Sequence, residues 1–502
     1  MTSETLEHLT PEFVLIAVAM LIYTAGLFCD LRRRWKWIGA GGLGAAAVAL
    51  VWSQQTAPPE GGAIAADALA CYIRWLALGM GGLLVMSICR PAAKGMSWHV
   101  GSLLLAVAAL MLTAGAGNLI LLFASLELIS IPIYVLLWLG REGSDSEEVA
   151  AKYFFPGILA SAMLLYGFAF LYGMTGSTNL GAAAGALADP VGVSGNFGAF
   201  AGLARVLVFA GLGFKIAAVP FHFYAPDVFQ GTTHGNAALL STVPKAAGFV
   251  VIVRLLGPAM VNAEPGAWRI ILLTAVLTMT LGNVLALWQN NLRRLLAYAS
   301  IAQTGYVLMG LAAAPCGGIG AMWFYLDVYA IATIGTFAAL EYLGRVERSL
   351  DNIDELAGLA RTRPAIAAVI AVLMFSLTGI PPLAGFWAKL FVFRSTMDVG
   401  TPGLRPWFVA LAVIAAINAV VAAVYYLRLV RVMYFRVPLG TPKAEGGRGP
   451  RLAAVVSAAL VILIGILPGP LMNESNKAIP GGAIEHSEAA GYSLGDLQSR
   501  DQ

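Results

Sequence analysis

Charged side chains are scarce in this chain of 502 residues. Lys, Arg, Asp and Glu together make up 12% of it, hydrophobic residues make up 59%, and the mean hydropathy is +0.79. A soluble globular protein carries about 25% charged residues. The composition therefore excludes a soluble protein and predicts a polytopic membrane protein with no soluble domain of its own.

Cysteine is also rare, and its spacing excludes the usual metal sites. The four cysteines (Cys29, Cys71, Cys89 and Cys316) form no C-x-x-C pair, so we expect no iron–sulfur or zinc site. No G-x-G-x-x-G follows a predicted strand, so the usual sign of a dinucleotide site is missing. The N-terminus, MTSETLEHLTPEF, is acidic, so the first apolar run is interpreted as a membrane span and not as a signal peptide.

Long apolar runs are what the sequence has in abundance. A membrane helix needs about 20 mostly apolar residues. Fourteen stretches qualify, so we expect an all-α protein with spans near 12–30, 38–56, 66–89, 98–114, 117–139, 152–173, 198–220, 237–258, 268–288, 295–314, 319–342, 364–395, 405–430 and 451–470. The twelfth stretch is too long for one straight helix.

The loops between these spans differ in charge. Most lysines and arginines follow odd-numbered spans, whereas the opposite side holds only Arg394, Arg405, Lys477 and Arg500. Because cytoplasmic loops carry the excess of basic residues, the odd loops are predicted to face the cytoplasm and both termini the outer side. Arg74, Arg205, Arg254 and Arg269 lie near span ends, where we expect them to extend to the interface.

Four ionisable residues lie deep inside spans: Glu127, Lys215, Lys245 and Lys389. Such a residue costs about 2.5–3.5 kcal/mol on insertion scales, so each needs a reason, and the usual one is charge movement. An amine removed from water loses its proton more easily, and a neighbouring carboxylate restores the charged form. Glu127 is therefore the predicted modulator of the buried lysines.

Proline accompanies all three lysines. Pro220 follows Lys215, and Pro244 precedes Lys245. Pro381 and Pro382 precede Lys389. Proline in a helix frees the carbonyl four residues earlier, which here means Ile216, Leu377 and Thr378. Interrupted spans in corresponding halves of a transporter indicate an inverted repeat with the ion site at the breaks. Proline kinks that serve only packing are the alternative.

Because the interrupted spans are the seventh and the twelfth, spans 4–8 and 9–13 are the expected repeats. The predicted divisions of the chain are 1–97 for the first three spans, 98–260 and 264–436 for the two repeats, and 437–502 for the last span and the tail.

Several segments resemble subunit N of bacterial NADH:quinone oxidoreductase, respiratory complex I. They include FASLELISIPIYVLLWLGREG, GLGFKIAAVPFHFYAPDVFQG, NNLRRLLAYASIAQTGYVLMGL and LMFSLTGIPPLAGFWAKLFVF. The resemblance implies a proton channel of two inverted five-helix repeats in the bacterial inner membrane, with Glu127, Lys215, Lys245 and Lys389 as the translocating residues. It also implies partner membrane subunits, including sister antiporter-like subunits. NADH, FMN, iron–sulfur clusters and quinone would lie on partners, with no cofactor on this chain.

The resemblance separates this chain from its sister subunits. Subunit M carries glutamate where Lys389 stands, and subunit L continues into a long lateral helix that this sequence does not contain. Two departures from the family stand out. Gln303 occupies a position where related sequences often have histidine, and it cannot titrate. Asp327 falls where an apolar residue is expected. It is a partner charge on the proton path, a residue at the end of its span, or a core residue paired with a polar group.

Two histidines complete the candidate relay. His222 follows Pro220 and His234 opens the eighth span, and for each a relay role and a structural role remain open. Two other functions also remain open for the chain. One is a cation/proton antiporter subunit of the Mrp type or a membrane subunit of an energy-converting hydrogenase. The other is a structural subunit in which the charges only pair.

Overall fold

The computed structural model describes residues 3–29, 34–55, 63–88, 95–140, 144–188, 198–261, 265–344, 350–400, 403–438 and 444–479. These residues form α-helices joined by turns and short 3-10 segments. The helices are α1 (Ser3–His8), α2 (Thr10–Phe28), α3 (Arg34–Ser53), α4 (Ala68–Ser87), α5 (Met96–Ala114), α6 (Leu119–Trp138), α7 (Ser144–Thr175), α8 (Leu180–Ala188), α9 (Gly198–Lys215), α10 (Ala225–Gly231), α11 (His234–Val261), α12 (Pro265–Leu287), α13 (Leu292–Ala312), α14 (Gly318–Leu343), α15 (Leu359–Thr362), α16 (Pro364–Thr378), α17 (Ala384–Met397), α18 (Arg405–Phe435), α19 (Arg448–Ile466) and α20 (Gly469–Lys477).

Every expected span overlaps a helix. Eleven helices within the described ranges are long and apolar enough to cross a membrane by length and composition. The expectation of an all-α polytopic membrane protein is therefore confirmed, whereas fourteen crossings and two repeats stay predictions. The other three expected spans correspond to α3, to α9 and to α16 together with α17, and none of these helices is among the eleven.

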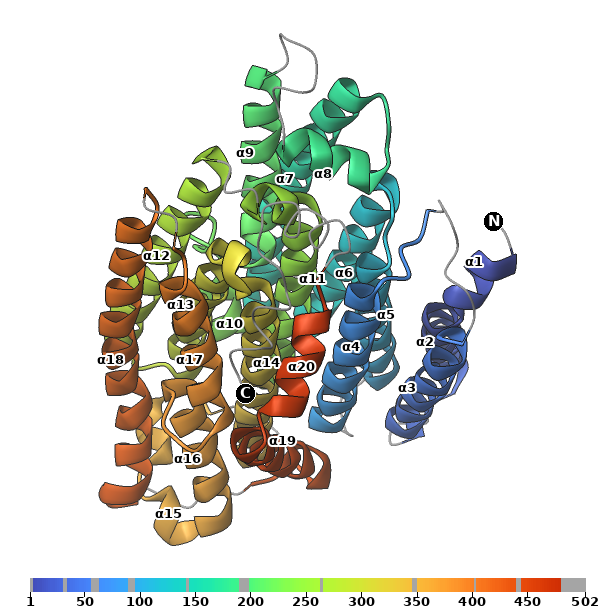
Figure 1. Cartoon of the computed structure of the whole chain (residues 1–502). Helices are drawn as coiled ribbons and strands as arrows, with labels where there is room; N and C mark the ends of the chain where they lie inside the picture. The colour runs from blue at the N-terminus through green and yellow to red at the C-terminus, as the bar shows by residue number, and fades with distance from the viewer. Residues whose placement is uncertain are drawn as a thin grey trace.

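The helices are not equally buried. α11, α13 and α14 lie at the centre, and nearly all their side chains are inside the protein. α2 and α3 stand at one edge of the molecule and α12 and α18 at the opposite edge (Figure 1). A helix that is apolar all round is stable where other helices or lipid surround it. Three of the candidate site residues, Lys245, Gln303 and Asp327, are buried on these central helices.

The seventh span was predicted to reach residue 220, and this end is wrong. α9 ends at Lys215, and turns follow until α10 begins at Ala225. Ala217 adopts a left-handed φ of 54°, and its N–H and that of Ala218 bond to the carbonyls of Phe214 and Gly213. This hydrogen-bond pattern is a Schellman motif, which ends a helix. The helix therefore stops before it reaches Pro220.

The twelfth span is interrupted as expected, and in the same way. Gly379 has a φ of 92°, and its N–H and that of Ile380 bond to the carbonyls of Ser376 and Phe375. Both prolines, Pro381 and Pro382, lie in the segment between α16 and α17. In each break a left-handed residue ends the helix and proline follows it.

Candidate functional site

The first break brings Lys215 to Glu127. Lys215 is the last residue of α9, where the helix dipole favours a positive charge. Its Nζ lies 3.4 Å from Glu127 Oε1 and donates to Ser130 Oγ at 2.5 Å, both on α6. Ser161 of α7 donates to the same carboxylate oxygen at 2.5 Å. Lys215 is buried, and the Glu127 side chain is 26% exposed.

Lys245 lies in the middle of α11, which continues through Pro244 without a break. Its Nζ donates to the carbonyl of Ser300 at 2.7 Å, to Ser300 Oγ at 2.6 Å and to Thr304 Oγ1 at 2.9 Å. It also lies over the Tyr329 ring, 5.6 Å from its centroid. The oxygens that bind this buried amine, among the residues described, are all neutral.

Lys389 of α17 reaches back across the second break. Its Nζ donates to the carbonyl of Thr378 at 2.7 Å and lies 5.2 Å from the centroid of the Tyr306 ring. Thr378 ends α16, and its carbonyl is one of those that the prolines were predicted to free. The break therefore supplies the acceptor for the lysine.

Helix α13 connects the two breaks. Thr304 accepts from Lys245 and donates to the carbonyl of Ile216, the residue after Lys215, at 3.1 Å. Gln303, beside it, donates to the carbonyl of Leu377 at 3.3 Å. All three carbonyls that the sequence predicted to be free thus accept from a side chain. Side chains three and four positions apart share one helix face, which brings Ser300, Gln303 and Thr304 together.

Gln303 uses both ends of its amide. The hydroxyl of Tyr325 donates to its Oε1, and its Nε2 donates to Tyr426 Oη at 3.2 Å as well as to Leu377. The side chain links α13 to α14, α16 and α18. Gln303 does not titrate, but its amide connects the polar groups of these helices through hydrogen bonds.

The two candidate histidines differ in position. His234 is buried and lies on the same face of α11 as Lys245, because eleven residues make about three turns and 16 Å. Its ring is 6.2 Å from that of Phe337 on α14. His222 lies in the turns after α9 and is half-buried, and its Nδ1 has no hydrogen-bond partner among the described residues.

Asp327 does not join the lysines. It is buried on α14, where it accepts a hydrogen bond from Tyr72 Oη of α4. Tyr325 and Tyr329, two positions before and after it, both belong to the lysine network. Two positions rotate a side chain by about 200° around a helix, so Asp327 points to the opposite side of α14.

Two buried ion pairs were missed, and the expectation that Arg74 and Arg254 extend to the interface is wrong. Arg74 Nε binds Glu12 Oε1 at 2.7 Å, with both side chains buried. Arg254 makes two bonds to Asp67, at 2.8 and 3.1 Å. Their partners are far away in the sequence, so no local pattern announces them. Each arginine satisfies its charge inside the protein.

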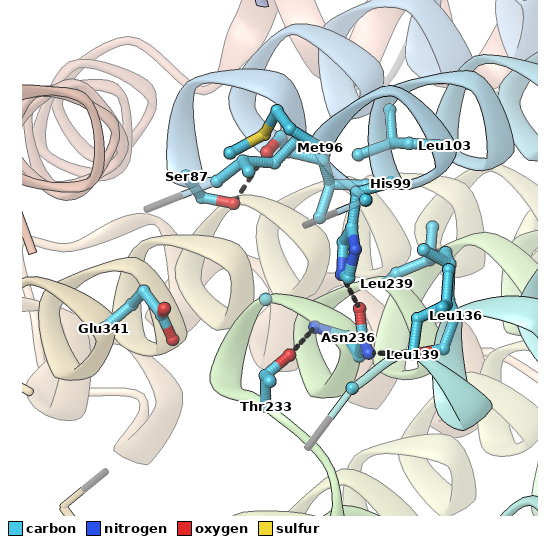
Figure 2. Close-up of a pocket in the computed structure, with 15 residues that line it drawn as sticks. Ser87, Met96, His99, Leu103, Leu136, Leu139, Thr233, Asn236, Leu239 and Glu341 are labelled. Carbon is cyan, nitrogen blue, oxygen red and sulfur yellow. Dashed lines mark hydrogen bonds between the residues drawn. The ribbon is translucent and has the colours of Figure 1, made fainter. Parts of the chain in front are cut away.

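A cavity of about 70 Å³ lies where α4 and α6 end and α5 and α11 begin. Figure 2 shows the His99 ring pointing at the Asn236 amide, a contact of 3.2 Å, with Glu341 on the far wall. Asn236 donates to the carbonyl of Leu136 at 2.7 Å. The volume is too small for a drug-sized ligand but holds a few waters.

Known proteins are similar to this chain in sequence and in fold. The family model described as "NADH:quinone oxidoreductase/Mrp antiporter, TM" matches residues 116–417. The chain is 40% identical to NADH-quinone oxidoreductase subunit N of Thiobacillus denitrificans, over 75% of this chain and 76% of the relative. It is 35% identical to the subunit N of Dehalococcoides mccartyi, over 93% of this chain and 98% of the relative.

Solved structures agree in fold. A chain of respiratory complex I from Thermus thermophilus, solved with bound aureothin, matches with a TM-score of 0.77 and 31% identity, over 92% of this chain and 99% of that chain. A chain of the Mrp complex from a Dietzia species matches with a TM-score of 0.81 but only 20% identity, over 97% of this chain and 99% of that chain. The second likeness concerns the fold alone.

Proposed function

Because the chain belongs to the family of NADH-quinone oxidoreductase subunit N, we propose that it is the proton-translocating membrane subunit of such a complex. It is a multi-pass protein of the bacterial plasma membrane, with both termini on the outer side and other membrane subunits as partners. It acts as a translocase subunit. NADH, FMN, iron–sulfur clusters and quinone bind to partner subunits, and redox chemistry there drives proton movement here.

The observation that carries this proposal is the polar connection from Lys215 to Lys389. Lys245 binds Thr304, which binds the backbone at the first break, and Gln303 binds the backbone at the second. Each lysine is buried among helices that exclude bulk water. Polar groups arranged near buried ionisable residues are what proton relays in membrane proteins use.

The proposed cycle begins with Glu127 paired to Lys215. At 3.4 Å and an effective dielectric constant of about 20, the attraction is about 5 kcal/mol and keeps the lysine protonated. When the pair opens, Lys215 releases its proton toward Lys245, whose neutral partners provide no compensating charge. The proton then passes along α13 to Lys389 and leaves on the outer side. The cavity beside Asn236, on the predicted cytoplasmic side, would supply the next proton.

Matching contacts support two inverted repeats at 98–260 and 264–436. Asn118 caps α6 and pairs with Asn179, and Asn291 caps α13 and pairs with Asn352. Asn118 and Asn291 are 173 residues apart, as are Asn179 and Asn352. The same asparagine cap and β-bridge thus stand at the start of the second helix of each proposed repeat.

The alternative function is a cation/proton antiporter subunit of the Mrp type or a membrane subunit of an energy-converting hydrogenase. A chain of the Mrp complex and a chain of an archaeal membrane-bound sulfane sulfur reductase share the fold, at 20% and 22% identity. The relatives named subunit N are 35–40% identical over most of the chain, so subunit N is the better-supported function. Sodium-dependent transport by the purified complex would favour the alternative.

The test is proton pumping by the whole complex in liposomes. Lys215→Met and Glu127→Gln remove the two charges of the first pair. We expect each variant to pump at least about a hundredfold more slowly, the lower limit for a lost acid–base group, while the complex still assembles. Pumping is followed with a pH-sensitive dye after NADH is added.

Lys152→Met is the matched control, because Lys152 lies at the exposed end of α7 and pairs with Glu148 and Asp227. It should pump as the unaltered complex does. Lys215→Arg and Glu127→Asp, which keep the charges, should retain part of the activity. Full coupled pumping by Lys215→Met or by Glu127→Gln would refute the cycle.

A further inference from the structure

The side of α14 that faces away from the lysines carries its own buried acid. Asp327 is 5% exposed, and Tyr72 of α4 donates to its Oδ2. Its Oδ1 has no hydrogen-bond partner among the described residues. A buried polar atom without a partner destabilises the folded protein. The proposed lysine cycle does not use this residue, so its burial needs a separate explanation.

A second unsatisfied group lies one turn away on the same face. Trp323 is fully buried, and its Nε1 also has no partner within the described part of the chain. Residues four apart on a helix have Cβ atoms about 5–6 Å from each other. A water placed between them accepts from the indole N–H and donates to Asp327 Oδ1. An N–H donor repels a metal ion, so the pair of groups fits water and a proton rather than a cation.

The site is close to the surface of the outer half. Asp327 lies nine residues, about 14 Å, from the start of α14. α20 packs against α14 and α4, and Asn476 lies over Gly320. Tyr72, whose hydroxyl donates to Asp327, is only half-buried. The other ionisable groups near Tyr72 are Cys71 and Arg74 of α4 and the exposed Glu474 of α20.

We propose that Asp327 is a proton-holding residue of a second site, formed with Tyr72 and a water on Trp323, that exchanges protons with the outer side. In release, the protonated carboxyl gives its proton to Tyr72 Oη while the Tyr72 O–H proton passes to outer water. The transferred proton lies on the Asp327 side of Tyr72 Oη, so Tyr72 again donates to the carboxylate. The hydroxyl rotates outward when Asp327 next takes up a proton. One proton leaves and the carboxylate remains. This inference rests on the proposed function, because the outer side and the proton traffic come from it.

The experiment measures pumping by the whole complex in liposomes while the pH of the lumen is varied. NADH does not cross the bilayer, so added NADH drives only complexes whose NADH site faces the bath, and the lumen then corresponds to the outer side. In the unaltered complex we expect the pumping rate to depend on lumenal pH. Asp327→Asn should lose that dependence and pump about a hundredfold more slowly. Asp327→Glu should restore it in part.

Tyr72→Phe removes only the hydroxyl and serves as the second variant if Asp327→Asn fails to assemble. It should also lose the dependence on lumenal pH. Asp398→Asn, a change at an exposed acid on the same predicted side, is the matched control and should behave as the unaltered complex. An unchanged pH profile in Asp327→Asn or in Tyr72→Phe overturns the proposal. If Lys215→Met slows pumping but these variants do not, this inference alone fails and the proposed function stands.

Discussion

The three buried lysines differ in what binds them, and this difference gives them separate roles. Lys215 has a carboxylate partner, Glu127, and a serine hydroxyl. Within the described part of the chain, Lys245 and Lys389 bind only neutral oxygens, in addition to an aromatic ring. A carboxylate holds a lysine in its charged form, whereas a carbonyl offers a weaker hold. Movement of Glu127 therefore changes the charge balance at one lysine and leaves the others in place.

Gln303 gives the prediction at the scale of a single residue. Gln303→Leu removes the acceptor of Tyr325 and the donor to Leu377, so two buried groups lose partners. We expect a loss of stability of about 2 kcal/mol or more and slower proton pumping. Gln303→His keeps one donor and one acceptor and should pump close to the unaltered rate. Pumping in liposomes and the thermal midpoint of the purified complex measure both effects.

The comparison between Gln303→Leu and Gln303→His tests whether the polar amide of Gln303 takes part in proton transfer or only fills space. If Gln303→Leu pumps as well as Gln303→His, the amide is not part of the proton path. Thr304→Ser provides a control on the same face of α13, since it retains the hydroxyl that binds Lys245 and the carbonyl of Ile216.

At the scale of elements, the two broken helices end with the same hydrogen bonds but different residues. The left-handed position holds alanine, Ala217, in the first break and glycine, Gly379, in the second. A left-handed conformation costs a residue with a Cβ about 1–2 kcal/mol, whereas glycine adopts it freely. A Cβ on Gly379 would also lie 2.9 Å from Lys389 Cδ. Glycine is therefore favoured at the second break, because it avoids the cost of the left-handed conformation and leaves the Lys389 side chain in place.

Exchanging these residues tests this account. Ala217→Gly should stabilise the protein by about 0.5–1 kcal/mol, because the relief of strain exceeds the entropy that glycine adds to the unfolded chain. Gly379→Ala should destabilise it by at least about 1 kcal/mol and displace Lys389, so pumping should fall. Thermal unfolding of the complex measures the first effect, and dye-monitored pumping measures the second.

The matched control is Gly173→Ala on α7, where an added Cβ meets no atom within 4 Å. It should leave the thermal midpoint unchanged or raise it slightly, since alanine is the better helix former. A Gly379→Ala variant as stable and as active as Gly173→Ala would show that the left-handed turn is not needed.

At the scale of the whole molecule, loop charge predicts one orientation in the membrane. Arg361 is exposed in α15, on the side of the basic loops, and Lys477 is exposed at the end of α20. In a background without native cysteines, a membrane-impermeant maleimide added to intact cells should label Lys477→Cys and not Arg361→Cys. After the cells are opened, it should label both. The opposite labelling would reverse the predicted orientation of the termini.

Much of this structure follows from composition and local pattern. Apolar runs of about 20 residues must be helices in a bilayer, because lipid offers no hydrogen bonds to the backbone. The same rule marks Glu127, Lys215, Lys245 and Lys389, since each stands alone among apolar neighbours. Proline likewise predicted that the carbonyls of Ile216, Leu377 and Thr378 need other donors. All these inferences use only residues that are close together in the chain.

What the sequence by itself determined is the class of protein, the positions of its helices and the buried charges that need an explanation. The tertiary structure decided which groups meet. It placed Glu127 on Lys215, α13 between the breaks, and Asp327 on the far side of α14 against Tyr72. It also joined Glu12 to Arg74 and Asp67 to Arg254. These partners lie tens to hundreds of residues apart, and periodicity does not encode such contacts because helix packing alone sets them.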